Sequence, residues 1–278
     1  MLRLLHIEFQ KLRYNKAAKV LTATYFILIT FIALLASIEF DFGAIHFRFA
    51  DQGFFNFPYI WHFNTYVASW AKLFLAIIIV SMMANEYSYR TLKQNLIDGL
   101  SKKEFIASKF LTVTVFALIS TIFVFIISLI LGFSFSDYTE FSIITRDLIY
   151  IPAYFLKLLA FFSLCMFLGV LVKRSAFALG FLIIWWIFEY IIYGVLKFLV
   201  FKNSTIADQI IQFLPLEAMA NVIREPFSRL NFVQSAANQL GAGFQKDYAI
   251  YTHEILLLLL WTLIFVYLSY TVMRRRDL

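Results

Sequence analysis

Three charged side chains stand inside long apolar stretches of the sequence, where a charge is unfavourable unless something compensates it. Glu189 lies in the stretch 181–196, FLIIWWIFEYIIYGVL, and Lys72 and Lys157 lie in two others. A buried carboxylate must be paired, hydrogen-bonded or protonated. Glu189 therefore either forms a fixed ion pair with Lys72 or Lys157 that sets helix packing, or lies on a path that solutes cross. A proton relay is less favoured, because one carboxylate is not a chain of groups.

Other patterns that carry chemistry do not occur in the sequence. There is no P-loop, no HExxH and no CxxC pair, and the single Cys165 is expected to be a small packing residue. His46 and His62 share one predicted loop and could in principle bind a metal ion, but interfacial aromatic residues are the favoured interpretation. The sequence therefore predicts no enzyme, no metal site and no cofactor bound by this chain.

The composition is that of a membrane protein. Of 278 residues, 62% are hydrophobic and 15% charged, whereas soluble domains are about 45–50% apolar and about 25% charged. A transmembrane helix needs roughly 20 mostly apolar residues. Six segments qualify and predict an all-α membrane protein with a single transmembrane domain over 1–278: 17–38, 64–84, 107–133, 149–172, 176–201 and 252–273.

The distribution of charge predicts the orientation. Basic residues gather in the leader, in the polar segment 85–109, in the link 173–175 and in the tail 274–276. With six spans these four places fall on one side, and the links 39–63 and 134–148, which carry an acidic excess, fall on the other. Cytoplasmic loops carry the excess of Lys and Arg. We therefore expect both termini to be cytoplasmic in an inner membrane. The net charge of +7 then faces anionic lipid rather than nucleic acid.

Short helices are expected on both sides of the membrane. The leader 1–15 has an apolar and a polar stripe and predicts a helix lying on the membrane; a frayed extension of the first span is the alternative. After the fifth span, an apolar stripe over 206–214 predicts a short helix broken at Pro215, and 216–224 predicts a second one that ends before Pro226.

The polar segment 85–109 divides into two helical parts. Apolar residues recur at steps of three and four up to Leu100, and Gly99 suits the left-handed residue that ends a helix. Ser101 and Glu104 form a capping box that starts the next helix. A short helix held at a fixed angle where the chain leaves the membrane suits the transmission of a push. A solvated turn with incidental amphipathicity is the alternative.

The residues of this segment also resemble a known family. Glu86-x-x-x-Arg90-Thr91, then Leu96, then Ser101-Lys-x-Glu104 and Lys109, resemble the cytoplasmic segment of ABC-2 type permeases, the membrane subunits of ATP-binding-cassette exporters. The six-span layout is similar as well. The resemblance implies that 86–98 is a coupling helix seated in a separate ATPase subunit, which binds the ATP and Mg. It also implies a second permease chain, the same or related.

The resemblance implies a role for each residue of this segment. Glu86, Arg90, Thr91 and Asp98 would contact the ATPase or stabilise the helix. Leu92, Leu96 and Leu100 would pack the helix in place. Gly99, Ser101 and Glu104 would set its angle. Spans two and five would line the translocation path, with Lys72, Trp185 and Glu189 on or near it. A charge in the middle of span five departs from the family pattern.

Two other classes of protein are less favoured. A self-contained secondary transporter or channel predicts inverted repeats and broken midplane helices, and the sequence shows no repeat. A membrane-embedded enzyme needs a polar catalytic cluster at one depth, which Glu189 and scattered histidines do not supply. We therefore expect the permease subunit of an exporter. The many aromatic residues hint at an amphipathic substrate, although lipid-facing phenylalanines explain them equally well.

Overall fold

The computed structural model describes residues 2–35, 38–42, 45–48, 53–202, 205–229, 231–239 and 246–276. Six of its helices are long and apolar enough to cross a membrane. They are α2 (Lys16–Leu35), α3 (Tyr59–Ser88), α5 (Lys102–Phe135), α7 (Tyr150–Val172), α8 (Ser175–Gly194) and α12 (Thr252–Arg274). The chain therefore has the helices of a multi-pass membrane protein, at the six places that the sequence predicts.

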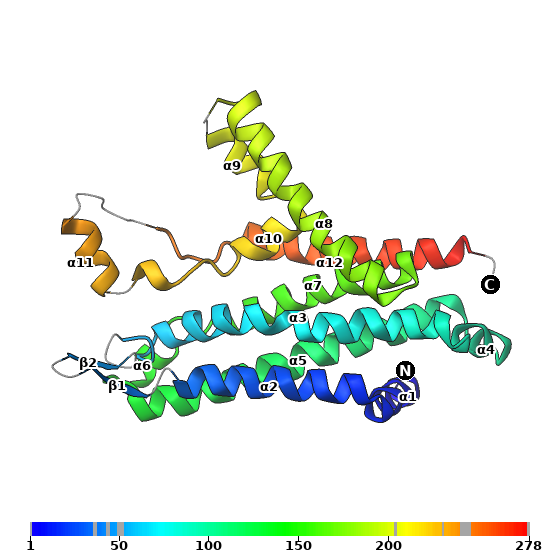
Figure 1. Ribbon diagram of the computed structural model, residues 1–278, viewed down its shortest axis with the longest axis horizontal. Coiled ribbons are helices and arrows are strands. Elements are labelled where there is room, and N and C mark those ends of the chain that lie inside the picture. Colours follow the sequence, from blue (N-terminus) through cyan, green and yellow to red (C-terminus); the bar gives the residue numbers. More distant parts are fainter. Residues whose placement is uncertain are drawn as a thin grey trace.

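Helix α7 lies at the centre of the bundle and packs against α3, α5 and α12 (Figure 1). It is buried along most of its length. It lies close to α3 at Gly169, where a Cβ atom would lie 2.7 Å from the Cβ of Met83. Glycine is therefore required here by the contact between two helices. The face of α7 that meets α3 also sets how the charged residues of α3 are oriented.

Helix α8 leans away from the bundle, and α9 (Thr205–Ile211) lies beside it (Figure 1). Only Ala178, Leu182 and Glu189 are buried in α8, so most of its apolar side chains are exposed. Its last turn, Val195–Val200, continues as a π-helix. Such turns have one residue more than an α-helical turn. An exposed apolar helix is expected where lipid or another chain covers it.

The shorter elements differ in part from the predictions. The leader forms α1 (Leu2–Tyr14), as the sequence predicts. The predicted break at Pro215 between two short helices is confirmed: α9 ends at Ile211, and Pro215 occupies the first turn of α10 (Pro215–Asn221), where the N–H that proline lacks would be unbonded anyway. Four elements were not predicted: α6 (Phe141–Ile144), the 3-10 turn Phe227–Arg229, α11 (Asn231–Gln239) and an antiparallel hairpin of β1 (Glu39–Phe42) and β2 (Ile45–Arg48).

The bundle has two distinct ends. Both chain termini and the short helix α4 (Thr91–Ile97) lie at one end, which we call the α4 end, and the β-hairpin and α11 lie toward the other (Figure 1). This grouping agrees with the sequence analysis, in which the leader, the segment 85–109 and the tail fall on one side.

Candidate functional site

Helix α4 connects two long helices, α3 and α5, and has a defined turn at each of its ends. It begins after Arg90, whose φ of 57° and ψ of 16° lie in the left-handed region. The turn that terminates it contains Gly99, whose φ is +96°. The N–H of Gly99 donates to the carbonyl of Leu96 at 3.2 Å, and the N–H of Leu100 donates to that of Asn95 at 3.0 Å. These two bonds form a Schellman motif, so the predicted role of Gly99 as helix terminator is confirmed.

The next helix starts with the predicted capping box. The amide of Glu104 donates to Ser101 Oγ at 3.2 Å, and the amide of Ser101 donates to Glu104 Oε2 at 2.9 Å. Two N–H groups that would lack partners at the start of α5 are thereby satisfied. The chain between α4 and α5 consequently has little freedom, and α4 is held at a fixed angle to α5.

One face of α4 packs on the bundle and the other is open. Leu92 is buried, and Leu96 and Leu100 are half-buried against the core. Tyr89 is 74% exposed and Ile97 75% exposed. The remaining exposed residues of this face are polar: Arg90, Lys93, Gln94 and Asp98. The leucines thus pack α4 against the helical bundle of its own chain. The opposite side is charged and exposes two apolar side chains.

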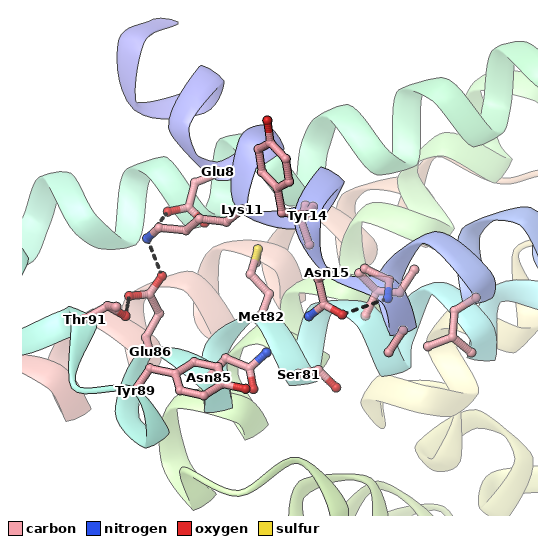
Figure 2. Close-up of a pocket in the computed structure, with 15 residues that line it drawn as sticks. Glu8, Lys11, Tyr14, Asn15, Ser81, Met82, Asn85, Glu86, Tyr89 and Thr91 are labelled. Carbon is pink, nitrogen blue, oxygen red and sulfur yellow. Dashed lines mark hydrogen bonds and ion pairs between the residues drawn. The ribbon is translucent and has the colours of Figure 1, made fainter.

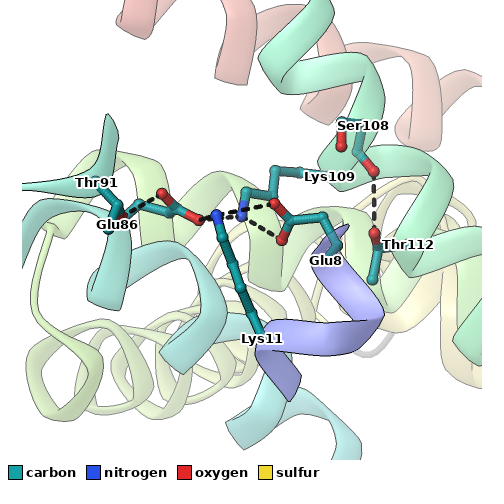
Figure 3. Close-up of polar contacts among 7 residues, drawn as sticks. All are labelled: Glu8, Lys11, Glu86, Thr91, Ser108, Lys109 and Thr112. Atoms are coloured by element: carbon teal, nitrogen blue, oxygen red, sulfur yellow. Dashed lines mark hydrogen bonds and ion pairs between the residues drawn. The ribbon is translucent and has the colours of Figure 1, made fainter. Parts of the chain in front are cut away.

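A cluster of four charged side chains, three of them buried, lies next to α4 (Figure 3). Lys109 Nζ is 2.5 Å from Glu8 Oε2 and 2.5 Å from Glu86 Oε1. Lys11 Nζ is 2.8 Å from Glu86 Oε1 and 3.3 Å from Glu8 Oε1. Thr91 Oγ1 donates to Glu86 Oε2 at 2.6 Å. We call these five residues the ion-pair cluster.

The ion-pair cluster joins four helices. Glu8 and Lys11 come from α1, Glu86 from the last turn of α3, Thr91 from the start of α4 and Lys109 from α5. Its two carboxylates and two ammonium groups balance, and Lys109 is fully buried. Burial alone would lower the pKa of Lys11, but its hydrogen bonds to Glu86 and Glu8 and their negative charges raise that pKa above its ordinary value. Lys11 therefore carries its positive charge at neutral pH.

A cavity of about 460 Å³ opens beside the ion-pair cluster (Figure 2). It lies between α1, the start of α2, the end of α3 and α4. Its walls are mostly apolar, with Leu12, Leu21, Ile78 and Met82 among them, and Glu8, Lys11 and Glu86 stand at one side. The leader helix thus contacts the bundle through its charged residues as well as through Phe9 and Leu12, and space remains next to the charged residues.

Glu86 is not part of the short helix, so the predicted range of 86–98 for that helix was wrong. Helix α3 continues through Glu86 to Ser88, and α4 covers only Thr91–Ile97. The reason is the ion-pair cluster, which compensates a carboxylate in the last turn of α3. Glu8 had no predicted role, and Lys109 was predicted only as part of the motif in 85–109. Glu8 stands between Leu5 and Leu12 on the apolar stripe of the leader, and a charge in that position was the available signal.

Glu189 has a different partner from the one expected. Glu189 Oε1 accepts hydrogen bonds from Trp185 Nε1 at 2.8 Å and from the amide of Leu216 at 3.2 Å, and Oε2 accepts from the amide of Glu217 at 3.1 Å. Those amides are in the first turn of α10, so the carboxylate of α8 caps another helix. A negative group is stabilised at a helix N-terminus. Within the described residues no ion pair joins Glu189 to Lys72 or Lys157.

The two lysines of the apolar stretches also have other neighbours. Lys72 Nζ lies 4.3 Å from the ring centroid of Phe161 on α7. Lys157 Nζ donates to the carbonyl of Ile223 at 3.4 Å. The structure therefore brings Trp185 and Glu189 together on α8 and leaves Lys72 apart from them, at the contact of α3 with α7.

The described residues contain no group of three or more side chains suited to a metal ion. His62 Nε2 lies 2.8 Å from the carbonyl oxygen of Arg224, and His62 Nδ1 lies 3.1 Å from Arg229 Nη1. Its ring stacks on Tyr150 at 4.3 Å. Both ring nitrogens are therefore occupied by protein groups. The side chain of His46 lies outside the described residues.

A comparison with known protein families gives a match over most of the chain. The model of a family described as a protein of unknown function (DUF2705) matches residues 26–278, which include all of the long helices except the first turns of α2. A search of curated proteins finds no match.

Proposed function

The chain belongs to the DUF2705 family, and we propose that it is the membrane-spanning permease subunit of an ATP-driven exporter. A separate ATPase subunit binds ATP and Mg and hydrolyses the nucleotide. This chain supplies the path through the membrane, together with a second permease chain, the same or related. The observation that carries the proposal is α4, a short helix outside the six spans. One of its faces packs against the bundle and the other is exposed.

The outer face of α4 has the properties of a docking surface. Protein interfaces are enriched in tyrosine and arginine, with exposed apolar anchors surrounded by polar residues. Tyr89 and Ile97 supply such anchors, and Arg90, Lys93 and Asp98 surround them. The backbone of Arg90 has a left-handed conformation, which costs residues other than glycine roughly 1–2 kcal/mol. Its side chain is therefore directed by a strained turn rather than by a flexible loop.

The proposed orientation puts α4 in the cytoplasm of an inner membrane. Both termini lie at the α4 end of the bundle (Figure 1), and the basic residues of the leader, of the segment 85–109 and of the tail belong to it. The positive-inside rule assigns that end to the cytoplasm. An ATPase that uses cytoplasmic ATP can reach α4 only from this side.

The ion-pair cluster supplies a route for the transmission of force. Closure of the ATPase around ATP would push α4, and Thr91 at the start of α4 is bonded to Glu86. Glu86 is bonded in turn to Lys109 on α5 and to Lys11 on α1. A displacement of α4 therefore moves α1, α3 and α5 together, so that spans one to three rock against spans four to six.

The second permease chain is proposed to stand against α8. This span is the least buried of the six, and its exposed apolar side chains lie on a helix that leans from the bundle (Figure 1). The path between the two copies would then pass Trp185 and Glu189 on α8. Lys72 on α3 faces α7, so we propose for it a place beside the path rather than on it.

Copurification tests the proposal directly. The tagged chain is extracted from its native membranes in mild detergent, and ATP hydrolysis and the identity of bound subunits are measured. We expect an ATP-binding-cassette ATPase to copurify. Ile97→Asp is expected to weaken its binding about tenfold, because a desolvated charge replaces an apolar anchor. Arg90→Glu should act in the same direction.

Phe141→Asp is the matched control, because Phe141 is 80% exposed and lies on α6, away from α4. It should leave copurification unchanged. If the unmodified chain captures no ATPase, the proposed function is wrong. Ion flux catalysed by the purified chain alone in vesicles would favour a channel or secondary transporter instead.

A further inference from the structure

A second cavity, of about 440 Å³, lies between α8 and the two short helices that follow it. Three aromatic residues of α8 line it, Trp186, Tyr190 and Tyr193. Its opposite wall is formed by residues of α9 and α10. The cavity lies in the half of α8 that is farther from the α4 end, since α8 starts at Ser175 after the link from α7.

Three carboxylates line this cavity, and no lysine, arginine or histidine does. Glu189 is satisfied by the amides of α10, and Asp208 pairs with Lys197 at 3.1 Å and accepts from Tyr193 at 2.7 Å. Glu217 differs from both. Within the described residues no ion pair involves Glu217, and Asn221 is its hydrogen-bonding neighbour. Among the three carboxylates of the cavity, Glu217 is the one that neither a cation nor the N–H groups of a neighbouring helix compensate within the described residues.

The surroundings of Glu217 favour a cation. Burial raises the pKa of Glu217, because removal from water disfavours its charged form. A positive group in the cavity would stabilise the carboxylate and replace the lost hydration. The faces of tryptophan and tyrosine attract cations as well, and Trp186 and Tyr190 form an edge-to-face pair with centroids 4.9 Å apart.

The remaining walls are apolar. Ile211, Leu216 and Ala220 line the cavity opposite the aromatic residues. The exposed side of α8 next to it is also apolar, with Ile187 and Ile191 exposed. A bound molecule can therefore place its charged group near Glu217 and its apolar part along the exposed apolar side of α8.

We propose that this cavity binds an organic cation with an apolar body, with Glu217 as counter-ion and Trp186 and Tyr190 as aromatic faces. The binding site stands on its own geometry. Its further meaning, that cationic amphiphiles are the class of substrate exported, rests on the proposed function. Anionic lipids and neutral sterols lack the charge that Glu217 would select.

Two probes of similar shape and opposite charge test the proposal. The full-length chain, reconstituted in lipid nanodiscs, is dialysed against labelled tetraphenylphosphonium or labelled tetraphenylborate, and empty nanodiscs give the background. We expect saturable binding of the phosphonium above background and none of the borate. Glu217→Gln should raise the Kd for the phosphonium about tenfold, which is the effect of losing one charge-assisted contact of about 1.4 kcal/mol. Trp186→Leu should weaken binding in the same direction.

Glu140→Gln is the control, because it removes the same charge from an exposed residue outside the cavity. Binding by this variant should equal that of the unmodified chain. Glu217→Asp, which keeps the charge, should bind better than Glu217→Gln, and this comparison separates loss of charge from loss of folding. Equal binding of both probes, or an unchanged Kd in Glu217→Gln, would overturn the proposal. Cation binding by a chain that captures no ATPase would support the site and refute the exporter.

Discussion

Lys109 Nζ lies 2.5 Å from Glu86 Oε1 in the interior, although the two residues are 23 positions apart and belong to different helices. The same ammonium group contacts Glu8 from α1. One lysine thus holds two carboxylates, and each of these also contacts Lys11. Lys109 is fully buried whereas Lys11 is exposed, so removal of Lys109 leaves the two buried carboxylates without their buried partner.

Lys109→Met is therefore expected to lower the free energy of unfolding by about 3–5 kcal/mol, the range found when one partner of a buried ion pair is removed. The measurement is the midpoint of thermal unfolding in detergent, followed by size-exclusion chromatography. Lys103→Met is the control, because Lys103 is exposed at the start of the same helix. It should change the midpoint little.

The double variant Glu86→Gln with Lys109→Met tests whether charge is the cause. It removes one negative and one positive charge and leaves Glu8 and Lys11 as a pair. We expect it to be more stable than Lys109→Met alone, since interacting residues are not additive. A double variant as unstable as the sum of both single variants would contradict the ion-pair cluster.

Gly99→Ala should destabilise the turn after α4 by about 1 kcal/mol or more, because alanine tolerates a φ of +96° poorly. A Cβ at Gly99 would meet no atom within 4 Å, so the effect isolates the backbone conformation. Gly180→Ala is the matched control, since its Cβ also meets nothing but its backbone is helical. That variant should be neutral or more stable. Unfolding midpoints of the two variants that move in the same direction would argue against the left-handed turn.

Gly169→Ala should separate α7 from α3. The added Cβ would lie 2.7 Å from Met83 Cβ and 3.3 Å from the carbonyl oxygen of Val80. Overpacking of this kind costs typically about 1–3 kcal/mol, and the unfolding midpoint should fall accordingly. Gly194→Ala, whose Cβ would meet no atom within 4 Å, is the control and should leave the midpoint nearly unchanged.

Glu189→Ala should loosen α10 without unfolding the bundle. It removes the acceptor of the amides of Leu216 and Glu217, and loss of a helix cap costs about 0.5–2 kcal/mol. Hydrogen exchange at these two amides should become faster, while exchange in α7 stays the same. Glu189→Gln keeps an acceptor oxygen and should give an intermediate rate. Unchanged exchange at 216 and 217 in the alanine variant would refute the cap.

The sequence predicts the features that depend on local pattern. Six apolar stretches predict six long helices, Gly99 predicts the end of α4, and Ser101 with Glu104 predicts the start of α5. Each of these depends on residues within one or two turns. The contacts among distant helices were not predictable in this way. Glu86 and Lys109 appear in one motif, but nothing in their spacing indicates that Glu8 joins them.

Glu189 shows that the depth of a charged residue along its helix does not identify the groups with which it forms hydrogen bonds or ion pairs. Lys72 and Lys157 stand in other long apolar helices, yet the rotation of each helix about its axis decides which side chains meet. Lys72 faces Phe161, Lys157 faces the carbonyl of Ile223, and Glu189 faces α10. Backbone N–H groups are available as hydrogen-bond donors at every helix start, and composition does not reveal which of them will be used.

The π-helical turn after α8 makes the shape of the cavity between α8, α9 and α10 depend on the number of residues in that turn. A π-turn holds one more residue than an α-turn, and each residue of an α-helix turns the chain by about 100°. Deletion of one residue within Val195–Val200 would remove the π-turn and change the direction in which the chain leaves α8 toward α9. Asp208 on α9 would then no longer lie beside Lys197 and Tyr193, whereas Glu217 would stay with α10, which packs on α7 and α12. Relatives that differ by a single residue here would share the bundle but not the cavity.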